Sequence, residues 1–265
     1  MERYIVAHDL TCIRLKDALA QEGCSLCRLR EYYGRKCLSW LLHEQVNDMA
    51  TRLKLAQSWG FCTYHAWLLQ KMEWERSHDG MATAILWEWL VKRYCTILQH
   101  SLEESCVRKK RLWHKWRWWR PSRPAEPLLQ AFAPEGICPT CASQQQSEAY
   151  TLQVLTQHLA EEASFKTLYK QSGGLCMPHF KAALASAEQV QAVRVLVEVQ
   201  LETLGRLAEE LSEYLRKHDY LYSHEPYGSE ADAFIRATAL LVGKAPSSGA
   251  CQGASGPRSA GFRES

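Results

Sequence analysis

Cys24-Ser-Leu-Cys27 is followed, after 34 intervening residues, by Cys62-Thr-Tyr-His65. The same pattern recurs 114 residues further along as Cys138-Pro-Thr-Cys141 and, again after 34 residues, Cys176-Met-Pro-His179. In both copies a glycine stands two residues before the cysteine of the Cys-x-x-His pair, as Gly60 and Gly174. Chance placement of cysteines rarely gives four ligand-type residues and a glycine at one constant offset. We therefore interpret the chain as an internal duplication of a metal-binding unit.

The residue types and their spacing are typical of structural zinc sites. Zinc in such sites takes four ligands in a tetrahedron, commonly cysteine thiolates and histidine nitrogens. Residues three apart at a helix start are neighbours, and the positive end of the helix dipole favours thiolates there. We predict two zinc ions. Pairing within each half is the simpler assumption, and exchange between the halves is the alternative; the local sets are Cys24, Cys27, Cys62 and His65, and Cys138, Cys141, Cys176 and His179.

Other chemistries remain open for these residues. An iron–sulfur cluster with three cysteines and one histidine is possible, although thiolate-only ligation is commoner. A redox-active Cys-x-x-Cys dithiol is favoured less, because the usual strand-then-helix context is missing. Four protein ligands per half would close the metal shell, whereas catalytic zinc keeps an open position. Full shells argue against an enzyme, and we assign no catalytic residue and no further cofactor site.

The periodicity of apolar residues predicts an all-α protein. Apolar side chains recur at three- and four-residue steps over 38–49, 81–99 and 190–215, with little two-residue alternation. Each Cys-x-x-Cys is expected to open a helix of about 30 residues. We expect two related helical halves packed as one pseudo-symmetric unit, with these segments: a first metal-binding half (1–106), a linker (107–127), a second half with a C-terminal helix (128–243) and a disordered tail (244–265).

The composition indicates a soluble, cytoplasmic protein. Of the 265 residues, 46% are hydrophobic and 23% charged, and no segment reaches the length and apolarity of a membrane-spanning helix. No secretory signal peptide is visible at the N-terminus. The count of 11 cysteines is odd, and in a reducing cytosol paired Cys-x-x-Cys motifs indicate metal or redox chemistry rather than disulfides.

The segment from Arg108 to Arg123 is strongly basic. It contains eight Lys/Arg and no acid, whereas the whole chain has a net charge of only +3. Four tryptophans alternate with these cations: Trp113, Trp116, Trp118 and Trp119. Such a composition suits single-stranded nucleic acid or an anionic membrane surface, and a solvated linker is the plainer alternative.

The C-terminal region carries a further set of polar residues. Lys217-His-Asp-Tyr220 is followed by Glu225-Pro226 and Arg236. Asp219, Tyr220, Glu225 and Arg236 could form a polar site. We favour a structural interpretation, in which Lys217 ends a long helix, Glu225-Pro226 begins the last one and Arg236 forms an ion pair.

Together with the duplicated motif, this C-terminal region resembles a bacterial family catalogued as domain of unknown function 6062. The resemblance covers roughly residues 4–243. Family members often have arginine after the Asp-Tyr pair, where this chain has Leu221. It implies a small soluble helical protein and transfers no activity.

Taken together, the residues predict a zinc-binding helical protein that serves as an interaction or scaffold protein. A redox or iron–sulfur protein is the alternative, and a nucleic-acid-associated factor acting through the basic segment is the second. Trp67 and Trp74, seven residues apart on one helix face, are expected to pack in the core.

Overall fold

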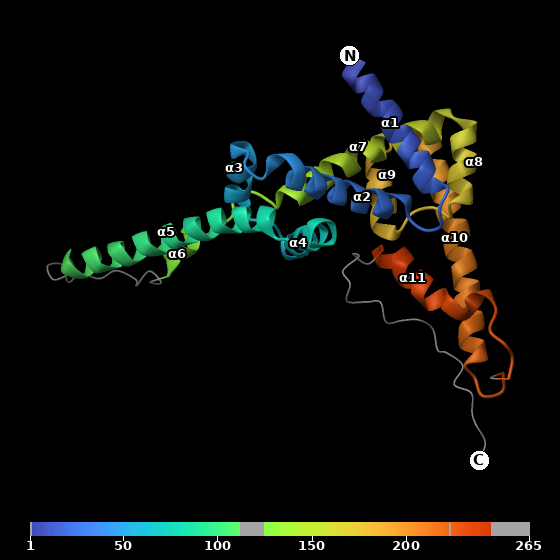
Figure 1. Ribbon diagram of the computed structural model, residues 1–265. Helices are drawn as coiled ribbons and strands as arrows, with labels where there is room; N and C mark the ends of the chain where they lie inside the picture. Colours follow the sequence, from blue (N-terminus) through green and yellow to red (C-terminus); the bar gives the residue numbers. More distant parts are fainter. Residues whose placement is uncertain (1, 112–124, 223, 245–265) are drawn as a thin grey trace, which may run out of the picture. The chain divides into compact units, whose positions relative to one another are not determined.

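The computed structural model describes residues 2–111, 125–222 and 224–244, and within these ranges the chain is helical without any β-strand (Figure 1). The prediction of an all-α protein is therefore confirmed. The internal duplication and the pseudo-symmetry stay predictions. In chain order the helices are α1 (Glu2–Leu19), α2 (Ser25–Trp40), the π-helix η1 (Leu41–Gln45), α3 (Met49–Ser58), α4 (Thr63–Ser77), α5 (Met81–Arg111), α6 (Glu126–Ala131), α7 (Pro139–Glu161), α8 (Ala163–Gln171), α9 (Met177–Ser186), α10 (Val190–Lys217), the 3₁₀-helix η3 (Ser229–Asp232) and α11 (Ala233–Val242).

The chain divides into two compact units whose boundaries differ from the segments expected from the sequence. Unit 1 comprises Met1–Tyr33 and Gln144–Ser265, and unit 2 comprises Gly34–Ser143. Each unit therefore combines residues from both sequence halves. The divisions fall inside α2 and α7, so these two helices belong to both units.

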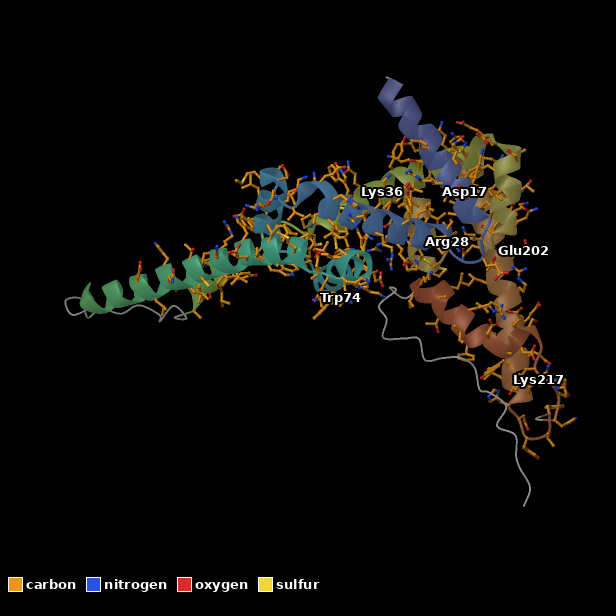
Figure 2. All side chains as sticks on the ribbon, in the orientation of Figure 1. Asp17, Arg28, Lys36, Trp74, Glu202 and Lys217 are labelled. Carbon is orange, nitrogen blue, oxygen red and sulfur yellow. The ribbon has the colours of Figure 1, made fainter. Side chains whose placement is uncertain are left out.

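Unit 1 has its own apolar core. Leu15 and Leu19 of α1, together with Leu26 of α2, are buried among side chains from α7 to α10. Helices α8, α9 and α11 pack against the long helix α10 (Figure 1). Arg28 of α2 closes the C-terminal end of α1, because its guanidinium donates to the carbonyls of Ala18 (2.7 Å) and Glu22 (2.6 Å; Figure 2). Since the last carbonyls of a helix have no partner within the helix, the contact with Ala18 supplies one of them, while Glu22 lies in the turn that follows α1.

Unit 2 is built around a separate, smaller core. Its fully buried members come from the end of α2, η1, α3, α4 and α5: Leu38, Leu41, Leu55, Leu68, Leu69 and Leu86. Beside this core, Trp59, Tyr94 and Phe132 form an aromatic cluster with ring centroids 4.9–5.5 Å apart. The expected core packing of Trp67 and Trp74 is wrong, because 67% and 59% of these side chains are exposed.

The prediction of helices of about 30 residues after each Cys-x-x-Cys is also wrong. In the first half α2 passes into η1, and Asp48 then starts α3 by accepting a hydrogen bond from the backbone N–H of Thr51 (2.8 Å). In the second half Glu162 has an extended backbone and separates α7 from α8. The Asp48 carboxylate favours a new helix start over continuation of the preceding helix. The apolar periodicity of the sequence does not show this boundary, because it continues on both sides of it.

Both repeated glycines have a positive φ. Gly60 has φ +105° and Gly174 has φ +78°. Each also lies close to a neighbouring helix: an added Cβ would be 2.9 Å from Leu90 Cδ2 at Gly60 and 3.2 Å from Gln200 Oε1 at Gly174. A residue with a side chain would therefore meet both backbone strain and a steric conflict.

Candidate metal centres

All four ligand pairs occupy equivalent positions at the start of a helix. Cys24, Cys62, Cys138 and Cys176 each immediately precede a helix, and the carbonyl of each accepts the backbone N–H four residues later at 2.8–3.3 Å. The first residue of each pair is thus the N-cap and the second is the third helical residue. A side chain at either position can turn toward the open N–H groups of the first turn. The local fold therefore aims both ligands of a pair at one point beyond the helix end.

In unit 1 the starts of α2 and α9 meet. The potential ligand atoms of Cys24, Cys27, Cys176 and His179 all lie within 4.8 Å of one another. His179 Nδ1 is 3.4 Å from the sulfurs of Cys24 and Cys27 and 3.0 Å from that of Cys176. The sulfurs of Cys27 and Cys176 are 3.6 Å apart. Cys176 and His179 are buried, whereas the two α2 cysteines are half-buried.

In unit 2 the starts of α4 and α7 meet in the same way. Cys62, His65, Cys138 and Cys141 form a second group within 4.8 Å. His65 Nδ1 lies 3.3 Å from the sulfurs of Cys62 and Cys141 and 3.5 Å from that of Cys138. The sulfurs of Cys62 and Cys141 are 3.7 Å apart.

These groupings overturn the assumption of pairing within each half. The Cys-x-x-Cys of the first half meets the Cys-x-x-His of the second, and the reverse holds for the other site. All eight predicted ligands are brought together, but with exchanged partners. The physical reason is the division of the chain: α2 begins in unit 1 and α7 begins in unit 2, so each delivers its first turn to the unit that holds the other half's Cys-x-x-His.

The distances match the edges of a tetrahedron around one ion. With Zn–S of about 2.3 Å and Zn–N of about 2.0–2.1 Å, tetrahedral geometry gives S···S of about 3.8 Å and S···N of about 3.6 Å. The S···S separations of 3.6 Å between Cys27 and Cys176 and 3.7 Å between Cys62 and Cys141 are close to this edge. The S···N separations, 3.0–3.5 Å, are somewhat shorter than the tetrahedral edge. A disulfide needs sulfurs about 2.05 Å apart, and all six cysteines are free. Both sites therefore have the dimensions of a single-ion centre.

Without a cation the thiols of Cys138 and Cys141 resist ionisation. Burial raises the pKa of Cys138, and burial followed by repulsion from Cys138 raises the pKa of Cys141 to about 12. In the unit 1 site, burial lowers the pKa of His179. The contacts of the imidazole with Cys24, Cys27 and Glu148 outweigh burial and raise the pKa of His179 to about 11. Because metal ligands must be thiolates and neutral imidazoles, a divalent cation would bind with release of protons.

Glu148 orients the histidine of the unit 1 site. Its Oε1 lies 3.2 Å from His179 Nε2, while Nδ1 of the same ring faces the sulfurs. Contact with the imidazole lowers the pKa of Glu148, and Arg30 lies 3.9 Å from its other oxygen. A carboxylate behind a metal-binding imidazole fixes the tautomer and the ring orientation. Sequence reasoning missed this residue, because a glutamate seven positions after Cys141 carries no recognisable spacing signal.

The C-terminal polar residues form structural ion pairs. Arg216 bonds to Glu213 and Glu225, and Lys217, at the end of α10 (Figure 2), pairs with Glu230 at 2.6 Å. Arg236 bonds to Glu210 and Asp232 at 2.5 and 2.7 Å. Tyr220 is 82% exposed. The ion pair of Arg236 and the helix end at Lys217 are as predicted, but the last helix begins at Ala233 rather than at Glu225-Pro226.

The remaining sequence predictions concern residues that lie largely outside the described chain. The four tryptophans of the basic segment fall within 112–124, and the tail beyond Lys244 within 245–265. The predicted binding of nucleic acid or an anionic surface therefore stays a prediction. Among the residues that the structure describes, no helix is long and apolar enough to cross a membrane.

The described residues form a helical protein with two Cys₃His groups. Each group combines the Cys-x-x-Cys of one sequence half with the Cys-x-x-His of the other. A family model matches residues 6–248, and the chain belongs to that family, the family of unknown function DUF6062. The family suggested by the sequence is thus confirmed. Neither the comparison with curated proteins nor the comparison with solved structures gives a match.

Proposed function

We propose that the protein binds two zinc ions, one in each Cys₃His group, and that each ion stabilises the unit in which it lies. The observation that supports this most strongly is that two helix starts in each unit bring three sulfurs and one nitrogen within 4.8 Å of one another. Cys27 and Cys176 are 149 residues apart in the chain. A metal joining them cross-links segments that would otherwise contribute only local contacts.

The spacing favours a single zinc ion over an iron–sulfur cluster. In a cluster the cysteines bind different iron atoms, so their sulfurs are separated by the cluster itself. Here all four ligand atoms of each group lie within 4.8 Å, which suits one central ion. Mixed sulfur and nitrogen ligation in a tetrahedron is typical of zinc.

The closed ligand shells favour a structural role, and with it an interaction or scaffold protein. Three thiolates and one imidazole fill the four positions that zinc uses in structural sites. Exposed aromatic side chains support a role in protein interaction, since such residues are enriched at interfaces. Trp67 and Trp74 of α4 are the most exposed of the described tryptophans in unit 2, and Trp74 lies near the C-terminal end of that helix (Figure 2).

The exchange of ligands also supports the proposed duplication. If an ancestral unit with one Cys-x-x-Cys and one Cys-x-x-His had paired with a second copy by exchanging helices, fusion of the copies would give this connectivity. Exchange of identical elements is a low-cost route to dimers. Superposition of an experimental structure of unit 1 on unit 2 tests the idea, and unrelated paths of α2–α4 and α7–α9 would contradict it.

Native mass spectrometry with elemental analysis tests the metal proposal. We expect two zinc ions per chain in protein purified without added metal or chelator, and a colourless solution. A strong chelator should remove both ions, reduce the helical circular dichroism and lower the melting temperature, because binding is coupled to folding. Visible absorbance with stoichiometric iron and sulfide would instead support the iron–sulfur alternative. Unchanged helicity and melting after metal removal would contradict the stabilising role.

Site-specific photo-crosslinking tests the interaction role. A photoreactive residue at Trp74 should capture a protein partner in the native host, whereas the same residue at Glu75, which is also exposed and lies on α4, should do so less. Equal yields from both positions, or none from either, would argue against a partner on this helix.

A further inference from the structure

The end of α11 lies directly against the metal centre of unit 1. The backbone N–H of Lys244 donates to Cys27 Sγ at 3.5 Å. A Cβ added to Gly243 would lie 3.5 Å from Cys27 Sγ and 3.6 Å from Cys176 Sγ. The backbone of these two residues is therefore in contact with sulfurs from both helices that form the site.

The backbone conformation of Gly243 makes this approach possible. Its N–H closes the last turn of α11 by donating to the carbonyl of Ala239 at 3.0 Å. Its φ and ψ are 90° and 169°, a combination that is accessible almost only to glycine. This turn directs the next N–H toward Cys27. The Lys244 ammonium lies 3.7 Å from Glu31 of α2, and because the lysine side chain is largely exposed this ion pair contributes little.

The buried part of α11 lies at its other end. Ala233, its first residue, is the one member of this fully described helix that is buried. Arg236 forms ion pairs near the same end. Leu241 and Val242, by contrast, are 56% and 70% exposed. Since these apolar side chains bury little area, the contact with the sulfurs adds to the packing of α11 on α9 and α10 as an attachment of the C-terminal end.

We infer that Gly243 and Lys244 are a third segment of the unit 1 metal centre, and that docking of the C-terminal end of α11 is coupled to metal occupancy. This inference rests on the proposed function. Zinc with three thiolates and a neutral imidazole carries a net charge of about −1, and an N–H donor stabilises thiolate charge through a charge-assisted hydrogen bond. By linkage, a segment that tightens metal binding is itself held more tightly when metal is bound.

Substitution of Lys244 separates the backbone donor from the side chain. Lys244→Pro removes the N–H, and the extended ψ of Gly243 is compatible with a following proline. Lys244→Ala keeps the N–H and removes only the ammonium. We expect Lys244→Pro to weaken zinc binding at one of the two sites about 10–100-fold, as loss of an outer-shell partner does, and Lys244→Ala to bind like the wild type. Competition with a chromophoric chelator measures the affinities, and ¹¹³Cd NMR of the cadmium-loaded full chain shows which site changes.

Hydrogen exchange tests the reverse direction of the coupling. Cys176→Ser removes a ligand of the unit 1 site, and Cys62→Ser removes the equivalent ligand of unit 2. Amides of residues 239–244 should lose protection in the first variant and keep it in the second, while α7 amides near Leu155 report whether unit 1 as a whole stays folded.

The outcomes separate this inference from the proposed function. If the wild type binds no metal, the proposed function fails and the inference fails with it. If two ions bind but the proline and alanine variants have equal affinity and equal cadmium spectra, only the inference is overturned. Should Cys176→Ser unfold all of unit 1, the comparison of the two Lys244 variants still decides.

Discussion

Cys27 Sγ lies 3.6 Å from Cys176 Sγ, although 149 positions separate the two residues in the chain. The equivalent pair in unit 2, Cys62 and Cys141, is 3.7 Å apart over 79 positions. The two separations differ because unit 2 is formed by one continuous segment that interrupts unit 1. An ion in either Cys₃His group would thus cross-link segments of one unit, and the two ions would close chain loops of different length.

Double substitutions distinguish exchanged from local pairing. Cys27→Ser with Cys176→Ser damages one site twice, so native mass spectrometry should still find one zinc per chain. Cys27→Ser with Cys62→Ser damages both sites, so zinc should be absent or strongly reduced. Local pairing predicts the opposite assignment, because it places Cys27 and Cys62 in one site. Each single variant should retain one tightly held ion.

Glu148→Gln should weaken zinc binding in unit 1 alone. The amide keeps the shape of the side chain but removes the charge that holds His179 Nε2 at 3.2 Å. Loss of such a partner costs about 10–100-fold in metal affinity, measurable by chelator competition. Glu202→Gln is the matched control, since Glu202 is an exposed glutamate of α10 in the same unit (Figure 2). An equal affinity in both variants would rule out an orienting role for Glu148.

Glu73→Ala should destabilise unit 2 by about 2–3 kcal/mol. The carboxylate is 95% buried and accepts hydrogen bonds from the backbone N–H groups of Ala82 (2.6 Å) and Thr83 (2.9 Å) at the start of α5. Hydrogen bonds to a charged group contribute about 1.5–3 kcal/mol, and their loss leaves buried donors unpaired. Glu75→Ala on the same helix removes only an exposed ion pair with Lys71 and should cost less than about 0.5 kcal/mol. Urea denaturation of the zinc-loaded protein measures both variants; comparable losses would contradict the capping role.

Two glycine substitutions in unit 1 should act in opposite directions. Gly174→Ala introduces a Cβ at φ +78° and 3.2 Å from Gln200 Oε1, so we expect a loss of at least about 1–2 kcal/mol. Gly205 lies inside α10 with open space around its Cβ position. Gly205→Ala should therefore stabilise by about 0.5–1 kcal/mol, because alanine has the higher helix propensity. A destabilised Gly205→Ala variant would mean that this face of α10 is covered in solution.

The Lys217–Glu230 pair should make stability fall in acid. The contact with Lys217, followed by the backbone N–H of Gly228, lowers the pKa of Glu230 from 4.5 to about 2. Because the folded state favours the ionised form, this stabilisation is complete above about pH 4.5 and is lost as the pH falls toward 2. The loss of stability between pH 5 and 3 should be smaller for Glu230→Gln than for the wild type. Protonation of the metal ligands affects both proteins alike, so the difference between their melting temperatures isolates the pair; Glu209→Gln, an exposed change on α10, serves as control.

The eight Cys and His residues that form the two groups and the helical class were predictable from the sequence, but the pairing of the residues was not. The local set has the same number and types of potential zinc ligands as the exchanged set; it consists of Cys24, Cys27, Cys62 and His65. Spacing constrains residues three apart on one helix, and it contains no information on which helix start meets which. That choice depends on long-range packing of the buried leucines in each unit.

The helix boundaries and the exposure of α4 show the same limit. Apolar periodicity continues through 38–49, although Asp48 is the N-cap of α3. The capping residue, rather than the periodicity, determines where this helix begins. Trp67 and Trp74 share a helix face, as expected, but the sequence does not say whether that face meets the core. Hydrophobic residues are common on protein surfaces, so residue type alone could not decide.

In the sequence, unit 2 is inserted between the two segments of unit 1. This order determines when each Cys and His residue is made during synthesis. Cys24 and Cys27 emerge first, yet their structural partners Cys176 and His179 are made about 150 residues later. At about 5–20 residues per second this interval is roughly 7–30 s. If zinc binds during synthesis, Cys62 and His65 are the nearest competing ligands for most of this time. Correct assembly therefore requires that an early thiolate–metal contact be exchangeable, so the rate of ligand exchange, rather than metal affinity alone, governs how the newborn chain reaches its native connectivity.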